Sequence, residues 1–250
     1  MKYLFLYTLF FGFVLNSFAQ ILNVESLRKV TDTTGWSGSA TLDFTFARNQ
    51  NRFFIVSNDI HLQYKEQKSI VLFKNQLNFI KIQDNDFSNG GIQHLRYNYK
   101  ISKRIRWEAF VQAQYNKIIK IDFRGLAGTG LRFKLSKNDN YKFYLGSLVM
   151  YEHEELSDGT GINRDVRSSS YFSFSLYPNE NISIVSTTYY QPLLKQFSDF
   201  RIAMESSLVF KIHKHFAFKI THTFAYDTDP ALGIQNSHYN LKTGLAYSFD

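Results

Sequence analysis

A period-two alternation of apolar and polar residues runs through almost the whole chain from Gly35 onward. The last segment shows it clearly, because Tyr239 and Leu241 alternate with Asn240 and Lys242. Successive side chains of a β-strand point to opposite faces of the sheet, so each such segment has one apolar and one polar face. After the N-terminal stretch, no apolar run is long enough for a transmembrane helix. If this chain enters a membrane, it must therefore do so as a closed β-barrel.

The sequence contains about twelve alternating segments, each long enough to cross a bilayer when tilted. Short polar connections such as 65–68 and 102–104 interleave with longer irregular ones such as 84–90 and 155–165. Short turns at one end and long loops at the other are typical of bacterial outer-membrane barrels, and an even strand count returns both termini to the periplasmic side. The sequence predicts an all-β fold, a single antiparallel transmembrane β-barrel of about 12 strands, with the spans 36–48, 52–65, 68–82, 91–101, 105–119, 121–136, 140–154, 166–178, 182–192, 199–213, 216–227 and 238–249.

The first residues have the pattern of a secretory signal peptide. A lysine precedes an almost wholly apolar segment, 3–15, and Ser17 and Ala19 occupy the small-residue positions of a cleavage site. This segment is short for a membrane-spanning helix, so an uncleaved N-terminal anchor is the less favoured alternative. We therefore expect three parts, which are a signal peptide at 1–19, a periplasmic lead-in at 20–34 and an outer-membrane barrel at 35–250.

The composition limits how such a barrel is stabilised. Mean hydropathy is -0.27, as expected when apolar and polar residues cancel within each strand. The chain has no cysteine, so no disulfide stabilises it, although the predicted compartment is oxidising. Aromatic residues make up 17% of the chain. Those near predicted strand ends are expected to form interfacial girdles, namely Trp36, Tyr64, Trp107, Tyr115, Tyr151, Tyr226, Tyr239 and Phe249.

Alternation alone does not decide which face of the sheet points outward. The alternative is a soluble periplasmic β-sandwich or lipocalin-like barrel, with the aromatic residues in its core and an apolar ligand inside. The signal peptide and the loop lengths favour the membrane barrel.

The formal net charge is +8, but its lysines and arginines are spread along the chain without a recognition helix, so nucleic-acid binding is not expected. A basic barrel instead attracts anionic lipid phosphates or small anionic solutes. The candidate lumen-lining residues on the polar faces are Lys65, Arg96, Lys100, Glu108, Arg132, Lys134, Lys142, Glu205, Lys211, Lys219 and Lys242, joined by Arg167, Asp43, Asp59 and Glu152. Such a lining favours anions if the lumen is open. A closed, salt-bridged interior is an equal alternative.

Four patterns lie between His94 and Leu156. They are LRY at 95–97, EAFVQAQYNK at 108–117, RGLAGTGLRFKL at 124–135 and YEHEEL at 151–156, and GWSGS at 35–39 precedes the first strand. In these features the chain resembles the salt-stress-induced outer-membrane protein family, small barrels with no assigned chemistry. The resemblance implies an outer-membrane barrel whose motifs are structural. One departure is Asp250 after Phe249, because such barrels commonly end on an aromatic residue that the assembly machinery recognises.

Two patterns invite a catalytic or phosphate-binding interpretation, and each has a simpler one. Ser88-Asn89-Gly90 with His94 could indicate a hydrolase, but Asn-Gly is more often a turn. The glycines of 125–130 lack the lysine and helix of a phosphate-binding loop, so Gly128 and Gly130 are expected to bend the strand or make room in the lumen.

Two further clusters could bind a metal ion. Glu152 and Glu154 would face the same side of a strand, and Asp158 could join them around Ca²⁺, although a solvated acidic loop is the favoured interpretation. His213 and His215 lack a third ligand for Zn²⁺ and are expected to lie in a polar turn.

The sequence therefore favours an outer-membrane barrel with a structural or envelope-stress role, or a narrow anion-leaning pore. It indicates no catalytic, cofactor or metal site, and the chain is not expected to be an enzyme. The expected partners are outer-membrane lipids and lipopolysaccharide, the barrel-assembly machinery and small anionic solutes. The alternatives are an outer-membrane lipid hydrolase of the phospholipase or lipid A deacylase type, and the soluble periplasmic barrel with an apolar ligand.

Overall fold

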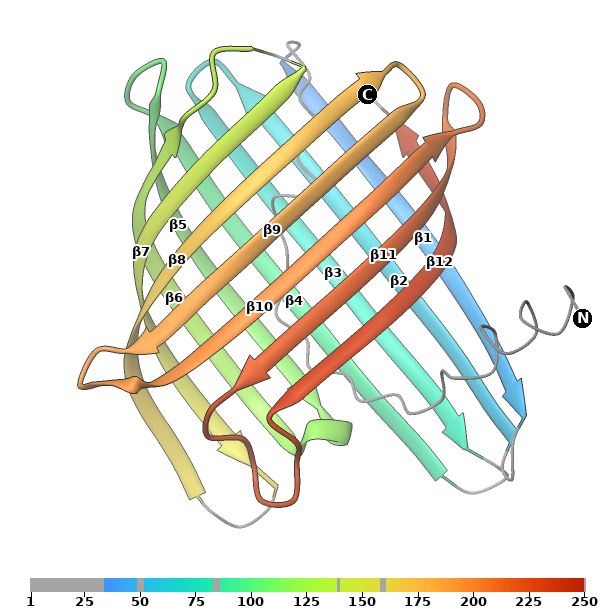
Figure 1. Ribbon diagram of the computed structural model, residues 1–250, viewed down its shortest axis with the longest axis vertical. Coiled ribbons are helices and arrows are strands. Elements are labelled where there is room, and N and C mark those ends of the chain that lie inside the picture. The colour runs from blue at the N-terminus through green and yellow to red at the C-terminus, as the bar shows by residue number, and fades with distance from the viewer. Residues whose placement is uncertain (1–33, 49–51, 83–85, 139, 158–160, 250) are drawn as a thin grey trace, which may run out of the picture.

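The computed structural model describes residues 34–48, 52–82, 86–138, 140–157 and 161–249, which form a closed antiparallel β-barrel (Figure 1). Each strand pairs with its neighbours in sequence, and the first strand closes the ring by pairing with the last. The strands are β1 (Gly35–Arg48), β2 (Arg52–Glu66), β3 (Ser69–Ile82), β4 (Asp86–Lys100), β5 (Ile105–Asn116), β6 (Ile121–Lys134), β7 (Tyr141–Leu156), β8 (Gly161–Asn179), β9 (Ile182–Leu193), β10 (Gln196–Lys211), β11 (Phe216–Asp227) and β12 (Ser237–Phe249). The prediction of a twelve-stranded antiparallel barrel is confirmed.

Two predicted parts of the chain are not tested by this fold. The signal peptide at 1–19 and the lead-in at 20–34 fall almost entirely outside the described residues and stay predictions. The barrel itself starts where the sequence places it, at Gly35.

Most strand boundaries lie within two residues of the sequence prediction, and the differences concentrate at the long-loop end. There β4 and β8 each begin five residues earlier than predicted, at Asp86 and Gly161, because Ser, Asn and Gly residues were taken as loop signals. The long connection implied between the predicted spans 182–192 and 199–213 is also wrong, since only a tight turn separates β9 from β10. Pro192 therefore lies in a strand, next to a register shift at the strand end where a missing N–H is tolerated.

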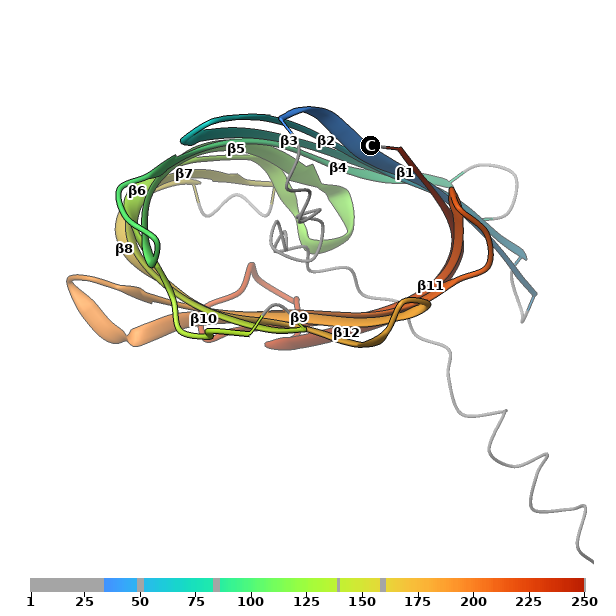
Figure 2. The same cartoon turned by 90° about the horizontal axis from the view of Figure 1, so that it is seen from above.

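The strand register divides the side chains into two sets. Directly paired residues share a face, so one chain of pairs, such as Asn98–Glu108–Gly130, runs around the inside and the next one around the outside. Seen from above, the strands enclose a flattened ring (Figure 2). The interior set is rich in buried polar and charged residues, whereas the exterior set supplies the exposed apolar ones.

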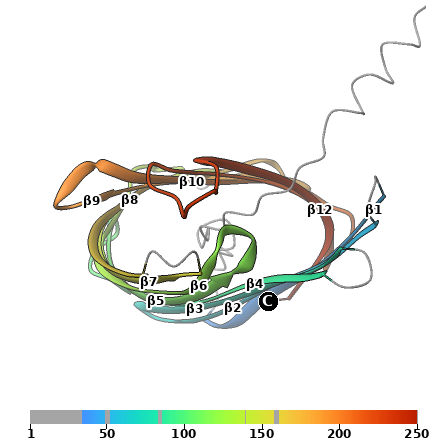
Figure 3. The ribbon, with the colours of Figure 1, turned by 90° about the horizontal axis from the view of Figure 1, so that it is seen from below.

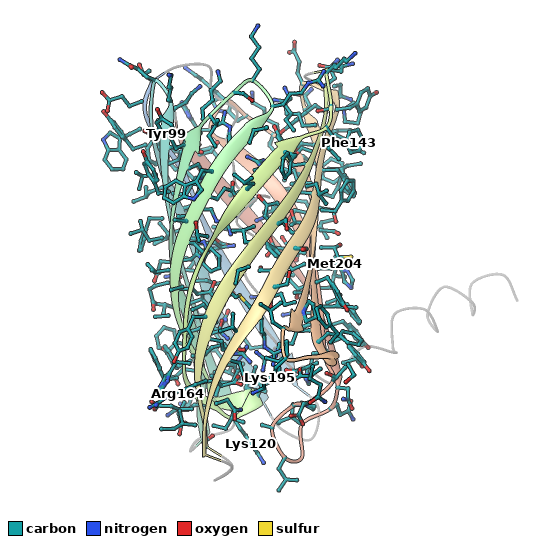
Figure 4. All side chains as sticks on the ribbon, turned by 90° about the vertical axis from the view of Figure 1, so that its left-hand side faces the viewer. Tyr99, Lys120, Phe143, Arg164, Lys195 and Met204 are labelled. Atoms are coloured by element: carbon teal, nitrogen blue, oxygen red, sulfur yellow. The ribbon has the colours of Figure 1, made fainter. Side chains whose placement is uncertain are left out.

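The outer surface has the pattern of a membrane barrel. Val111, Leu145 and Val149 are among many large apolar side chains that point outward and are exposed. Aromatic residues gather at both rims, as in the pairs Trp36–Tyr64 and Tyr190–Phe200, whose ring centroids are 5.1 and 5.6 Å apart. Figure 4 shows the same side chains around the whole barrel, with Tyr99 and Phe143 at one rim and Lys120 and Arg164 at the other.

The height between the rims fits a bilayer. On β7 ten residues separate the outward aromatic Tyr141 from Tyr151, about 33 Å along the strand and about 25 Å along the axis of a barrel tilted by about 40°. An apolar exterior and a polar interior are the reverse of what a soluble barrel with an apolar ligand requires, so that alternative is wrong. Within the described residues, no helix has both the length and the apolar character needed to cross a membrane.

The two ends of the barrel differ. At the short-turn end, which also holds the start of β1 and the end of β12, turns of a few residues join the strands. At the long-loop end, a short 3₁₀ helix, η2 (Lys117–Ile119), and the loop 228–236 bend toward the barrel axis (Figure 3). The two meet across the opening, where Lys120 Nζ donates to the Leu232 carbonyl at 2.7 Å. The outer segments therefore narrow this opening.

Candidate functional site

The barrel interior is the candidate site, and the predicted lumen-lining residues all belong to the interior set of the register. Arg96, Glu108, Arg132, Lys142, Glu205 and Lys219 are buried, and Lys65, Lys134 and Lys242 are partly buried. Lys100 and Lys211 lie at strand ends and are exposed.

Charge is distributed unevenly along the axis. Each strand has five residues nearest the short-turn end of the barrel, and some of these point into the lumen. All of these inward-pointing positions lie in the described part of the chain. They carry one carboxylate, Glu108, against nine cations, which are Lys65, Arg96, Lys100, Arg106, Arg132, Lys134, Lys142, Lys211 and Lys219. This group, the basic vestibule, has a formal charge of 9 - 1 = +8.

The long-loop end has a different composition. Its charged residues form the outer cluster, consisting of Arg124, Arg167, Arg201, Glu152, Glu154, Asp199 and Asp227. Glu152 is at the centre, because its oxygens lie 2.9 Å from Arg124 Nε and 2.8 Å from Arg167 Nε and also accept from Arg201. With three arginines and four carboxylates, the formal charge is 3 - 4 = -1.

Strand geometry explains how the outer cluster forms. Glu152 and Glu154 are two residues apart on β7, so both point inward. Arg124 lies opposite Glu154 in the register, and Arg201 on β10 reaches both glutamates across the lumen. The expected solvated acidic loop is therefore wrong for these two residues, whose exposed fractions are 1% and 3%.

A second buried network lies within the basic vestibule and connects it to Tyr171. Tyr171 donates its hydroxyl to Glu108 Oε2 at 2.7 Å, and Arg96 Nη1 lies 3.4 Å from the same oxygen. Arg132 Nε is 4.0 Å from the other oxygen, at the outer limit of an ion pair. The fully buried carboxylate of Glu108 thus lies within ion-pair distance of two buried arginines.

Between the two charged regions, apolar side chains from β5 and β7–β10 pack together on one side of the lumen. This apolar cluster consists of Phe110, Leu148, Met150, Tyr171, Tyr189 and Ala203. Glycines facing the lumen make room for it: a Cβ on Gly128 would lie 2.5 Å from the Phe110 ring, and a Cβ on Gly146 would overlap the Tyr171 ring. The expectation that Gly128 makes room in the lumen agrees with this packing. The interpretation of 125–130 as a phosphate loop is wrong, since these residues belong to β6.

On the opposite wall of the barrel the polar residues also pair. Lys74 Nζ lies 3.4 Å from Asp59 Oδ2, and Lys242 Nζ donates to Asn78 Oδ1 at 3.2 Å. The Ser57 hydroxyl donates to Asp43 at 3.5 Å. Most of the interior is therefore salt-bridged or hydrogen-bonded, and the basic vestibule is where cations exceed carboxylates.

The structure separates Ser88 and His94, the two residues of the hydrolase hypothesis, along β4. Six residues of β4 separate Ser88 from His94, about 20 Å along a strand, so the strand holds them too far apart to act as a pair. The side chain of Ser88 lies outside the described residues. His94 instead bonds through Nδ1 to Gln112 at 2.9 Å and through Nε2 to Arg96 at 3.3 Å.

The metal hypotheses find no support among the residues that the structure describes, where no group of three or more His, Cys, Asp or Glu side chains could hold an ion. Asp158 lies outside them. His213 and His215 occupy the predicted polar turn between β10 and β11, and His215 Nδ1 bonds to the Ser248 carbonyl oxygen at 3.0 Å.

The sequence analysis did not identify several charged residues that line the lumen. They are Lys74, Arg106, Arg124, Glu154, Asp199, Arg201 and Asp227. Glu154 ends the predicted span 140–154 but was expected to be solvated, and Asp199 and Arg201 followed a predicted loop that does not exist. The period-two rule applied from Glu152 to Glu154, and from Glu205 back through Arg201 to Asp199, would have placed three of them inside.

Comparison with known proteins gives a family and a fold. The family model described as "Protein of unknown function, DUF481" matches residues 31–249, and the chain belongs to this family. Among solved structures, the barrel is similar to the NanC porin, with a TM-score of 0.53, 9% identity and coverage of 84% of this chain and 100% of that one. It is also similar to the COG4313 outer membrane channel from Pseudomonas putida F1, with a TM-score of 0.53, 9% identity and coverage of 92% and 99%. No curated protein sequence matches.

The expectation of a family without assigned chemistry is confirmed at the level of this family of unknown function. At such low identity, the likeness to the two solved structures shows a porin-like, outer-membrane type of barrel fold and nothing finer.

Proposed function

We propose that this protein is a narrow channel in the outer membrane of a Gram-negative cell, with a preference for small anions. The observation that carries the proposal is the basic vestibule, where nine interior cations face one carboxylate. Fixed positive charge at one mouth of a low-dielectric pore raises the local concentration of anions and selects for them. In a barrel with short periplasmic turns, the vestibule opens toward the periplasm.

The channel is narrow because side chains occupy its middle and its outer mouth. The apolar cluster occupies one side of the central section, and the outer cluster with loop 228–236 restricts the long-loop end. We infer small inorganic or organic anions as solutes rather than polymers. The resemblance to the salt-stress-induced family adds osmotic stress as the proposed condition under which the protein is needed.

Single-channel recording in a planar bilayer tests the proposal, with protein extracted from membranes of cells that express it. A potassium chloride gradient should give a reversal potential shifted toward that of chloride. The double variant Lys65→Glu/Lys211→Glu replaces two positive charges of the vestibule by negative ones, at positions away from Glu108 and the apolar cluster. It should move the selectivity toward cations. The control Lys103→Glu/Lys214→Glu makes the same charge change in exposed turns and should leave the selectivity near that of the parent.

The second candidate function is a structural barrel with a closed lumen, which the salt-bridged interior favours. A correctly inserted barrel that passes no current at any voltage would support it and refute the channel.

A further inference from the structure

One part of the basic vestibule contains a row of like charges. In the register, Lys100 on β4 lies opposite Arg106 on β5, and Arg106 lies opposite Arg132 on β6. Directly opposed residues on one face have Cβ atoms about 5 Å apart, and like charges at such positions destabilise a sheet. Three cations in direct succession are therefore an arrangement that the fold alone does not favour.

Two more cations extend this row. Lys134 follows Arg132 by two residues on β6 and is diagonal to Arg106, and Lys142 on β7 is diagonal to Lys134. Diagonal neighbours on one face are about 7–8 Å apart, within reach of long side chains. We call Lys100, Arg106, Arg132, Lys134 and Lys142 the basic cluster.

Aromatic rings hold two of these cations in place. The guanidinium carbon of Arg132 lies 3.6 Å from the centroid of the Tyr144 ring, and Lys142 Nζ lies 5.4 Å from that of Tyr177. Arg132 and Lys142 are 3% and 6% exposed. Glu108 is shared between Arg96 and Arg132, so it does not neutralise both. The two buried cations held against tyrosine rings therefore form a preorganised surface with excess positive charge.

We propose that the basic cluster is a binding site for a doubly or more highly charged oxyanion, the chemistry of phosphate and its esters. A tetrahedral oxyanion accepts hydrogen bonds on several oxygens, which suits the fork of an arginine and the point charges of two lysines. Its charge would offset the repulsion within the row. This inference deepens the proposed function, because it names the class of anion that the vestibule retains.

Isothermal titration of the full protein, extracted in the phosphate-free detergent lauryldimethylamine oxide, tests the site with pyrophosphate as the probe. The parent protein should bind it saturably. The variant Arg106→Gln/Lys134→Gln, which leaves the buried Arg132 and Lys142 in place, should raise the dissociation constant at least tenfold. Lys65→Gln/Lys211→Gln lowers the vestibule charge equally outside the basic cluster and should change it less than threefold.

If the two double variants raised the dissociation constant for pyrophosphate equally, the proposal would be overturned, because the effect would then come from net charge and not from a site. Absence of saturable pyrophosphate binding by the parent would overturn it too. Both variants should run as folded, heat-modifiable barrels on a gel. Bilayer selectivity for chloride is measured separately, so an anion-selective channel that does not bind pyrophosphate refutes the site and leaves the channel standing.

Discussion

Gly146 controls how the lumen packs, and substitution by alanine tests this most directly. A Cβ at this position would overlap three atoms of the Tyr171 ring, whose hydroxyl donates to the fully buried Glu108. Gly146→Ala must therefore displace the ring. Overpacking of a well-packed interior costs roughly 1–3 kcal/mol. Losing a hydrogen bond to a charged group adds about 1.5–3 kcal/mol, so we expect a total of roughly 2.5–6 kcal/mol.

The assay is equilibrium unfolding by urea of the barrel in lipid vesicles, followed by the shift between folded and unfolded bands on a gel. Gly90→Ala is the matched control, because Gly90 also faces the lumen but its Cβ would make only ordinary contacts of 3.4 Å or more. In a Tyr171→Leu background, which removes the ring, Gly146→Ala should cost about 2 kcal/mol less, as expected for residues in contact. If Gly146→Ala and Gly90→Ala cost the same, the assignment of Tyr171 above Gly146 is incorrect.

The remaining predictions concern the outer cluster, the lipid-facing surface and the outer loop. Glu152→Gln leaves Arg167 and Arg201 without their central carboxylate and should lower unfolding stability by about 3–5 kcal/mol, whereas the same change at the partly exposed Glu155 should cost under about 1 kcal/mol. Leu145→Lys, near mid-height on the outer face between Tyr141 and Tyr151, should cost about 2–4 kcal/mol in vesicle unfolding, and Tyr141→Lys at the rim about 0–1 kcal/mol plus the loss of its ring; similar values at both positions would contradict the placement of the bilayer. Lys120→Met removes the bond to Leu232 and should speed amide exchange of Ile234 in loop 228–236 about fivefold, for a bond of about 1 kcal/mol; unchanged exchange would mean that the loop keeps its place without this bond.

The sequence predicts the barrel well because its main determinant is local. Alternation, short turns and strand length are all visible over ten to fifteen residues, and they identify which side chains face inward. The prediction fails where polar residues continue a strand past the membrane. β7 continues in this way beyond the predicted end at Glu154 to Leu156, and β8 begins at Gly161, because pairing with a neighbouring strand outweighs the loop propensity of Ser, Asn and Gly.

The partners of the interior charges could not be predicted. Arg201 and Glu152 are 49 residues apart and come from strands that are not neighbours in the barrel, so their contact depends on the diameter and the flattening of the ring. A sequence pattern fixes the face of a strand but not the reach across the lumen. The glycines that accept Tyr171 and Phe110 depend instead on the register, because Gly146 and Gly128 lie directly opposite these two rings on the neighbouring strands.

In the proposed channel, the uneven distribution of charge along the axis would make the current depend on the direction of the voltage. The basic vestibule has a formal charge of +8 at one mouth, whereas the ion-paired residues of the outer cluster at the other mouth sum to -1, so such a pore would conduct asymmetrically. Anions accumulate in the lumen when the voltage drives them in through the basic mouth, and they are depleted when it is reversed. The current–voltage curve should therefore rectify, and the sign of that rectification would report which way each barrel has inserted into the bilayer.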